Sequence, residues 1–143
     1  MAVIGREKRL SRLIEAELRG TLSAHGLDLA SFDVLATLRR SGPPYQLTPA
    51  ELMRTAMVTS GAISQRVDRL EESALVTRAP SAADGRVVHV ALTERGRSLI
   101  DQVLHEHLAA ENRLLASLTK RERAALADTL RHLLESLGDA YEA

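Results

Sequence analysis

One arginine on a predicted turn is the first candidate for chemistry in this sequence. Arg86 ends the charged tripeptide 84–86, which precedes six mostly apolar residues, 87–92. A guanidinium held at the tip of such a turn can enter the minor groove of DNA, because a narrow groove concentrates negative potential. Asp84, two residues earlier, can orient that guanidinium through a local salt bridge. The alternative is a plain polar turn, whose exposed ion pair contributes very little.

A helix predicted over 60–73 supplies a second candidate surface. Ile63, Val67 and Leu70 recur at helical spacing and are expected to point inward. Small residues near the start of a helix allow a close approach to a duplex, and hydroxyl, amide and guanidinium groups can bond base edges or phosphates. Such residues occupy the outward side, at Ser60, Gly61, Ser64, Gln65 and Arg69. An ordinary water-facing helix surface is the competing interpretation.

Other chemistries find little support in the residue types. Ser60 and Ser64 have no histidine near them in sequence, and the chain shows no glycine-rich phosphate loop or nucleophile elbow, so we expect no enzyme. Segment 105–107 reads His-Glu-His, but residues two apart on a helix point in nearly opposite directions. His107 with Glu111 is the better pair, and two ligands are too few for a closed zinc site. We therefore expect no metal and no cofactor.

Composition limits the size and setting of the protein. The 143 residues suit one domain, so 1–143 is taken as a single unit. Nineteen basic and nineteen acidic side chains give no formal net charge, although 54–97 is mildly basic and 101–143 mildly acidic. The chain has no cysteine, and no apolar run approaches the length of a membrane span. These features favour a cytoplasmic protein with no membrane partner.

The candidate residues lie within a predicted order of short elements. Two helices, over 6–24 and 29–41, precede a glycine-proline turn. Thr48, with Pro49 and Glu51 after it, begins a third helix through a capping box. The remaining elements are a helix over 60–73, strands over 75–78 and 87–92, and two long helices that begin at 93 and 119.

This order predicts a mainly α fold with a small β-hairpin wing, in the α+β class. Two short helices joined by a tight turn form a helix-turn-helix, and the hairpin adds the wing, so a winged helix-turn-helix occupies 29–92. Leucine-rich stripes on the flanking segments 1–28 and 93–143 exceed what one small core can cover. We therefore predict that both segments are dimerisation helices and that the protein is a homodimer.

The combined motifs resemble those of the MarR family of bacterial transcription regulators. The family's wing signature, Asp-x-Arg followed by Leu-Thr-x-x-Gly, is matched by Asp84, Arg86, Leu92, Thr93 and Gly96, and the resemblance covers essentially the whole chain. It implies a triangular homodimer whose winged lobes bind a palindromic operator, usually as a repressor released by a small ligand. Ala74 stands where the family most often has glycine, so the preceding helix is expected to end without a left-handed glycine.

Three charged residues suggest where such a ligand binds. Arg66 borders the buried stripe of its helix, Asp33 lies between two apolar residues of a core-facing helix, and Arg78 ends the first wing strand. In a urate-responsive subgroup of the family, matching residues belong to the ligand site. That subgroup also uses a tryptophan on an extra N-terminal helix, and this chain has no tryptophan. The resemblance implies a small anionic or aromatic acid that competes with Asp33 for Arg66. A purely structural ion pair between Asp33 and an arginine is the alternative.

Two functions from different classes remain. The first is a sequence-specific, ligand-responsive repressor that binds double-stranded DNA at an inverted repeat as a homodimer. The second is a protein-interaction module that keeps the winged fold but no longer binds DNA. The presence of Arg86, Gln65, Arg69 and Ser64 favours the first, because a chain that had stopped reading DNA would tend to lose them.

Overall fold

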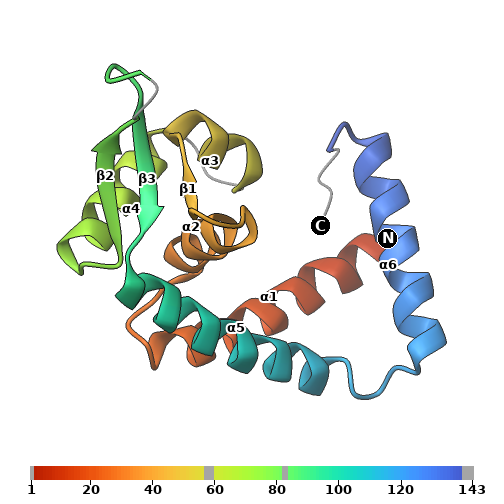
Figure 1. Ribbon diagram of the computed structural model, residues 1–143. Helices are drawn as coiled ribbons and strands as arrows, with labels where there is room; N and C mark the ends of the chain where they lie inside the picture. Colours follow the sequence, from red (N-terminus) through yellow and green to blue (C-terminus); the bar gives the residue numbers. More distant parts are fainter. Residues whose placement is uncertain (1, 57–59, 82–83, 140–143) are drawn as a thin grey trace.

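The chain forms a winged lobe with long helices extending from it. The computed structural model describes residues 2–56, 60–81 and 84–139. In chain order the elements are α1 (Ala2–Ser23), α2 (Leu29–Arg40), β1 (Gln46–Leu47), α3 (Pro49–Thr55), α4 (Ser60–Glu72), β2 (Val76–Pro80), β3 (Val88–Leu92), α5 (Glu94–Leu114) and α6 (Lys120–Ser136). Figure 1 shows α2 to β3 gathered in one lobe, with α5 running from it towards α6. Within the described residues no helix is both long and apolar enough to cross a membrane.

Threonine caps set the start of three helices, as the sequence predicts. Thr48 and Thr119 each form a complete capping box with the glutamate three residues later. Thr93 accepts a hydrogen bond from the backbone N–H of Gly96 at 2.9 Å. A fourth cap was not predicted. The side chain of Asp28 caps the start of α2 by accepting a hydrogen bond from the backbone N–H of Ser31 at 2.8 Å.

The wing is part of a three-stranded antiparallel sheet in the order β1-β3-β2. The predicted β2–β3 hairpin is confirmed, with Arg78 opposite Val90 and with β2 ending at Pro80. The third strand was not predicted: Gln46 pairs with Ala91 and Leu47 with Val90. Two residues are too few to show the alternation that reveals a strand in a sequence.

One apolar core joins the lobe to the first half of α5. The predicted inward residues of α2 and α4 are all buried, as are Ile100 and Val103 of α5. The side chains that are fully enclosed include Leu22, Leu35, Leu38, Leu52, Ile63, Val67 and Val90. Burial of a side chain of this size contributes roughly 1.5–3 kcal/mol, so this cluster fixes α4 and the sheet relative to α5.

The outer helices leave a large apolar surface uncovered. None of the residues of α6 is buried. The leucines of α6 at 126, 130, 133 and 134 and its C-cap Leu137 are between 38% and 76% exposed, and α1 adds Val3, Ile4, Leu10 and Leu13 at 50% or more. Exposed apolar stripes of this size on helices are typical of an interface with another protein surface.

The turn between α4 and β2 carries an unusual backbone conformation. Ala74 has a φ of 59°, in the left-handed region, where an L side chain costs roughly 1–2 kcal/mol. The conformation lets the backbone N–H of Leu75 donate to the carbonyl of Leu70 at 2.9 Å, which closes the helix end. The family's preferred glycine is absent, but the left-handed geometry is retained by alanine.

Candidate nucleic-acid interface

The α3–α4 pair forms the predicted helix-turn-helix. α4 packs on the lobe through Ile63, Val67 and Leu70, which are at most 3% exposed. The tight turn expected between these two helices falls on residues 57–59, which lie outside the described residues. Because one face of α4 is fixed in the core, the opposite face is held rigidly towards the surroundings.

The open face of α4 carries the residues predicted to meet DNA. Gly61, Ser64, Gln65 and Arg69 are all exposed, and Ser60 is the first residue of the helix. Gly61, Gln65 and Arg69 are each four residues apart, so they form one row along the helix. A Cβ added at Gly61 would meet nothing within 4 Å, which leaves the backbone open to close approach at this end of the row.

Figure 1 shows the tip between β2 and β3 projecting from the lobe, and Arg86 belongs to the segment between these two strands. The side chains of Asp84 and Arg86 are exposed, and residues 82–83 of the tip lie outside the described residues. Asp84 accepts a hydrogen bond from the backbone N–H of Arg86 at 3.0 Å, and its carbonyl accepts the N–H of Val87 at 3.0 Å. Among the described residues no ion pair joins Asp84 to Arg86; the carboxylate of Asp84 instead accepts from the backbone, and the Arg86 side chain is exposed.

Arg66 faces a cavity on another side of α4. The cavity, of about 540 Å³, lies between α4, the turn after α1 and the start of α5, and its lining includes His25, Asp28, Arg66, Arg69 and Arg95. Arg66 Nη1 pairs with Asp28, the residue that caps α2, and not with Asp33 as predicted. Among the described residues, the buried Nε of Arg66 has no hydrogen-bond partner. Burial works to raise the pKa of Asp28, but hydrogen bonds from Ser31 and the charge of Arg66 outweigh it, so this pKa lies below its ordinary value.

Asp33 and Arg78 lie apart from this cavity. Asp33 is partly buried, and burial raises its pKa against the opposing charges of Arg40 and His107. Arg78 forms ion pairs with two acids of α4, at 2.8 Å to Asp68 and 3.2 Å to Glu71. The three residues predicted to share a ligand site therefore have three different surroundings, because their shared pattern in sequence does not determine which way each side chain points.

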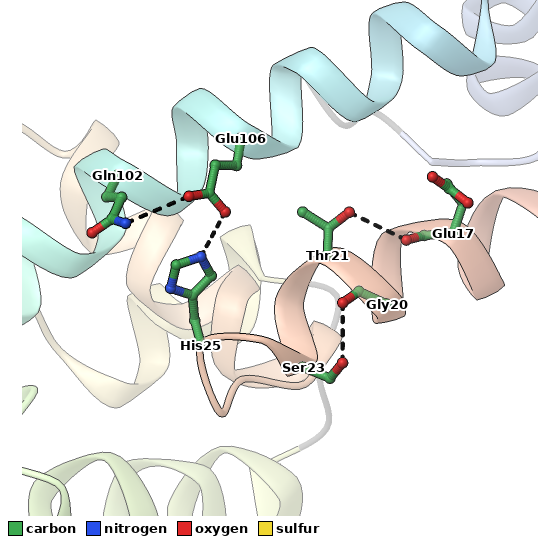
Figure 2. A network of polar contacts seen from close by, with 7 residues as sticks. All are labelled: Glu17, Gly20, Thr21, Ser23, His25, Gln102 and Glu106. Carbon is green, nitrogen blue, oxygen red and sulfur yellow. Dashed lines mark hydrogen bonds and ion pairs between the residues drawn. The ribbon is translucent and has the colours of Figure 1, made fainter.

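A polar contact joins α5 to His25, which follows α1 and lines the cavity. Figure 2 shows Glu106 of α5 in contact with His25, at 2.6 Å from Nε2, and with Gln102 of the preceding turn. The hydrogen bond with His25 lowers the pKa of Glu106. In the same view the hydroxyls of Thr21 and Ser23 bond to carbonyls of the last turns of α1. The contact joins the turn that lines the cavity to the long helix leaving the lobe.

The His-Glu-His segment is divided between separate contacts. His107 lies 3.1 Å from Glu111 and stacks on Phe32 with ring centroids 4.5 Å apart. Glu106 points to His25 instead. Across the part of the chain that the structure describes, no group of three potential ligands could hold a metal ion.

Sequence reasoning missed Asp28 and His25 as members of the cavity. Asp28 carried a signal that could have revealed it, since an aspartate directly before a helical run is a preferred cap. His25 carried no such signal, because its partner Glu106 is 81 residues away in the chain.

The fold and the exposed residues define a winged helix-turn-helix protein of the DNA-binding class. Residues 25–87 match the MarR family. The chain is 36% identical over 140 residues to the HTH-type transcriptional regulator PecS of Dickeya dadantii, covering 95% of this chain and 84% of that protein. It is 34% identical to the HTH-type transcriptional repressor Rv2887 of Mycobacterium tuberculosis, covering 91% and 88%.

A solved structure extends the likeness to three dimensions. A mutant of MarR from E. coli, in complex with operator DNA, superimposes with a TM-score of 0.80 at 30% identity, covering 92% of this chain and 93% of that one. The chain therefore belongs to the MarR family of helix-turn-helix transcription regulators, and it is a DNA-binding regulator of transcription.

Proposed function

We propose that two copies of the chain bind one inverted-repeat operator and repress transcription there. The α4 helix of each copy enters a major groove, where Ser60, Gly61, Ser64, Gln65 and Arg69 meet base edges and phosphates. The wing of each copy places Asp84 and Arg86 at the adjacent minor groove. The observation that supports this arrangement best is the exposed Arg86 at the tip of a wing that β2 connects directly to α4.

The competing function is a protein-interaction module that keeps the fold without binding DNA. The open row of Gly61, Gln65 and Arg69 argues against it, because the open backbone at Gly61 and the exposed amide and guanidinium side chains match what a duplex requires. We infer that the protein acts by binding and carries out no reaction. Its site of action is then the chromosome, in the cytoplasm.

Selection of bound sequences from a randomised duplex pool tests the DNA proposal. We expect an inverted repeat whose half-site centres lie about one helical turn apart, roughly 10 bp. Arg86→Ala should weaken binding broadly and lower the salt slope by up to about one unit, whereas Gln65→Ala should relax preference at particular bases. Arg121→Ala, an exposed arginine at the start of α6, is the matched control. If Arg86→Ala behaves like Arg121→Ala, the wing does not contact DNA.

We propose that the uncovered stripes of α1 and α6 form the homodimer interface. A core cluster holds the lobe together on its own, while α6 has no buried residue among those described. Apolar burial contributes about 25 cal/mol per Å², so mutual covering of these stripes supports an obligate dimer. Deleting residues 119–143 should cause aggregation or unfolding. A stable, soluble monomer from this truncation, seen by analytical ultracentrifugation, contradicts the proposal.

We further propose that a small anionic or aromatic acid binds in the cavity beside α4 and releases DNA. The volume of about 540 Å³ lies within the range of small-molecule sites. Arg66 offers its buried Nε, and Arg69 and Arg95 add positive charge. The acid competes for Arg66 with Asp28, which replaces Asp33 in this role. Because Asp28 also caps α2, its displacement disturbs both helices and moves α4 out of register with the operator.

Thermal melting with urate, salicylate and related acids tests the effector site. A ligand at 100 times its dissociation constant should stabilise the protein by about 2.7 kcal/mol and should also release the operator. Arg66→Ala should abolish both effects. Asp33→Asn should leave both unchanged, because Asp33 does not line the cavity. If no acid shifts the melting temperature, or one does so equally in Arg66→Ala, the site does not exist as described.

A further inference from the structure

One side of α4 faces the wing strand β2. Ser64, Asp68 and Glu71 recur at helical spacing and therefore share this side. It is distinct from the buried stripe and from the open row of Gly61, Gln65 and Arg69. The side chains of Asp68 and Glu71 are 61% and 43% exposed, so both carboxylates lie at the edge of the surface proposed to meet DNA.

Arg78 of β2 contacts all three residues on this side. Its Nη1 forms an ion pair with Asp68 Oδ1 at 2.8 Å and donates a hydrogen bond to Glu71 Oε1 at 3.2 Å. Its Nη2 donates to the backbone carbonyl of Ser64 at 3.4 Å. The backbone N–H of Arg78 also donates to Glu71 Oε2 at 2.9 Å, so one glutamate holds both the main chain and the side chain of the strand. The contacts span nearly two turns of α4.

This contact network fixes the orientation of β2 on α4 but adds little to the stability of the fold. Exposed ion pairs typically contribute between 0 and about 1 kcal/mol to stability. The planar guanidinium, however, presents its donors in a rigid fork, so three acceptors on one helix allow few orientations of β2. Arg78 pairs in register with Val90 of β3, and the two strands together carry the wing tip. A change in the angle between β2 and α4 therefore moves Arg86 relative to the open row.

We propose that Arg78 is a positioning residue for operator binding. It locks β2 to the wing-facing side of α4, so that Arg86 reaches the minor groove in register with α4 in the neighbouring major groove. It also neutralises Asp68 and Glu71, which otherwise repel the phosphates beside them. This inference rests on the DNA-contacting face proposed above, and it gives Arg78 a role different from the ligand contact predicted from sequence.

Footprinting on the duplex selected by the wild-type homodimer tests this role. Hydroxyl radicals report protection of the backbone along the minor groove, and dimethyl sulfate reports guanine N7 in the major groove. In Arg78→Ala we expect minor-groove protection by the wing to be lost while N7 protection persists, with binding about tenfold weaker. The melting temperature should stay close to that of the wild type. Thr77→Ala, an exposed neighbour on β2, is the matched control and should change neither footprint.

Two further variants separate positioning from charge neutralisation. Adding Asp68→Asn and Glu71→Gln to Arg78→Ala removes the uncompensated charges, so affinity should partly recover while the minor-groove footprint stays absent. Recovery of both would overturn the positioning role, as would an unchanged footprint in Arg78→Ala. Arg78→Lys keeps the positive charge but loses the forked guanidinium. We expect this variant to lose part of the minor-groove protection by the wing while its stability stays nearly that of the wild type. Full wild-type protection in this variant also overturns the proposal. If the wild type selects no duplex, the proposed DNA function fails instead.

Discussion

Replacing Gly96 with alanine tests the junction where the wing joins α5. A Cβ at this position would lie 2.0 Å from the carbonyl oxygen of Leu75 and 2.9 Å from its carbon. The first distance is about 1 Å below the 3.0 Å that real Cβ contacts respect, and the obstacle is backbone. That carbonyl also accepts the N–H of Thr93 at 3.1 Å, and the hydroxyl of Thr93 donates to Ala74 at 2.7 Å. The backbone of Leu75 therefore cannot move away from an added Cβ without breaking these hydrogen bonds.

The expected loss of stability in Gly96→Ala follows from two opposing effects. Overpacking a rigid site typically costs 1–3 kcal/mol or more, whereas alanine gains up to about 1 kcal/mol over glycine within a helix. We expect Gly96→Ala to be destabilised by about 2 kcal/mol, which for a chain of this length lowers the melting temperature by roughly 4–8 °C. The variant should also bind operator more weakly, because a shift at this junction changes how the winged lobe is oriented on α5.

Gly20→Ala in α1 is the matched control for this measurement. A Cβ at Gly20 meets nothing within 4 Å of the chain, so only the helix-propensity gain remains and the melting temperature should rise. Both variants are compared by scanning calorimetry at equal protein concentration, since the proposed dimerisation would make the melting temperature depend on concentration. If Gly96→Ala melts at or above the wild type, the close approach of Gly96 to Leu75 is not a real constraint.

Substitutions at three other positions should change stability in a definite direction. Ala74→Gly should stabilise the protein by about 0.5–1 kcal/mol in urea unfolding, because glycine relieves the positive φ while freeing the unfolded chain. Asp33→Asn should raise the melting temperature at neutral pH. Folding raises the pKa of Asp33, so the stability that comes from its protonated form is present below the unfolded pKa and is lost as pH rises through the folded pKa. The stability gained by the asparagine variant should therefore vanish in acid. Asp28→Ala should cost about 1 kcal/mol through the lost cap, and Asp28→Asn less, because asparagine also caps. The pKa of Asp28 is lowered, so its contribution is present above the unfolded pKa and should be lost as pH falls through the folded pKa.

Local signals in the sequence were sufficient for most of the fold. Threonine before proline or glutamate predicts where α3 and α6 begin, because the cap satisfies backbone donors within four residues. Helical spacing likewise predicts the buried side of α4, since a single periodicity determines which residues share a face. Both features depend on residues close together in the chain.

The charged contacts could not be predicted in this way. Arg66 pairs with Asp28 and not with Asp33, because the packing of α2 on α4 determines which of the two carboxylates faces Arg66. Arg78 pairs with Asp68 and Glu71 across the turn that Ala74 permits. Each choice depends on the angle between two elements, and no local pattern encodes that angle.

The sides of α4 suggest how a ligand signal reaches DNA. Arg69 belongs both to the open row and to the cavity lining, and Arg66, on the cavity side, directly follows Gln65 of that row. A helix moves as a rigid body, so in the proposed mechanism an acid that displaces Arg66 would also displace Gln65 and Arg69 from their proposed positions at the groove. The coupling is reciprocal: operator must weaken acid binding by the same factor by which the acid weakens operator binding. Titration of the wild type and of Arg78→Ala tests whether one rigid helix carries the signal: Arg78→Ala should loosen only the wing, so the size of this factor should stay unchanged, and a smaller factor in the variant contradicts the idea.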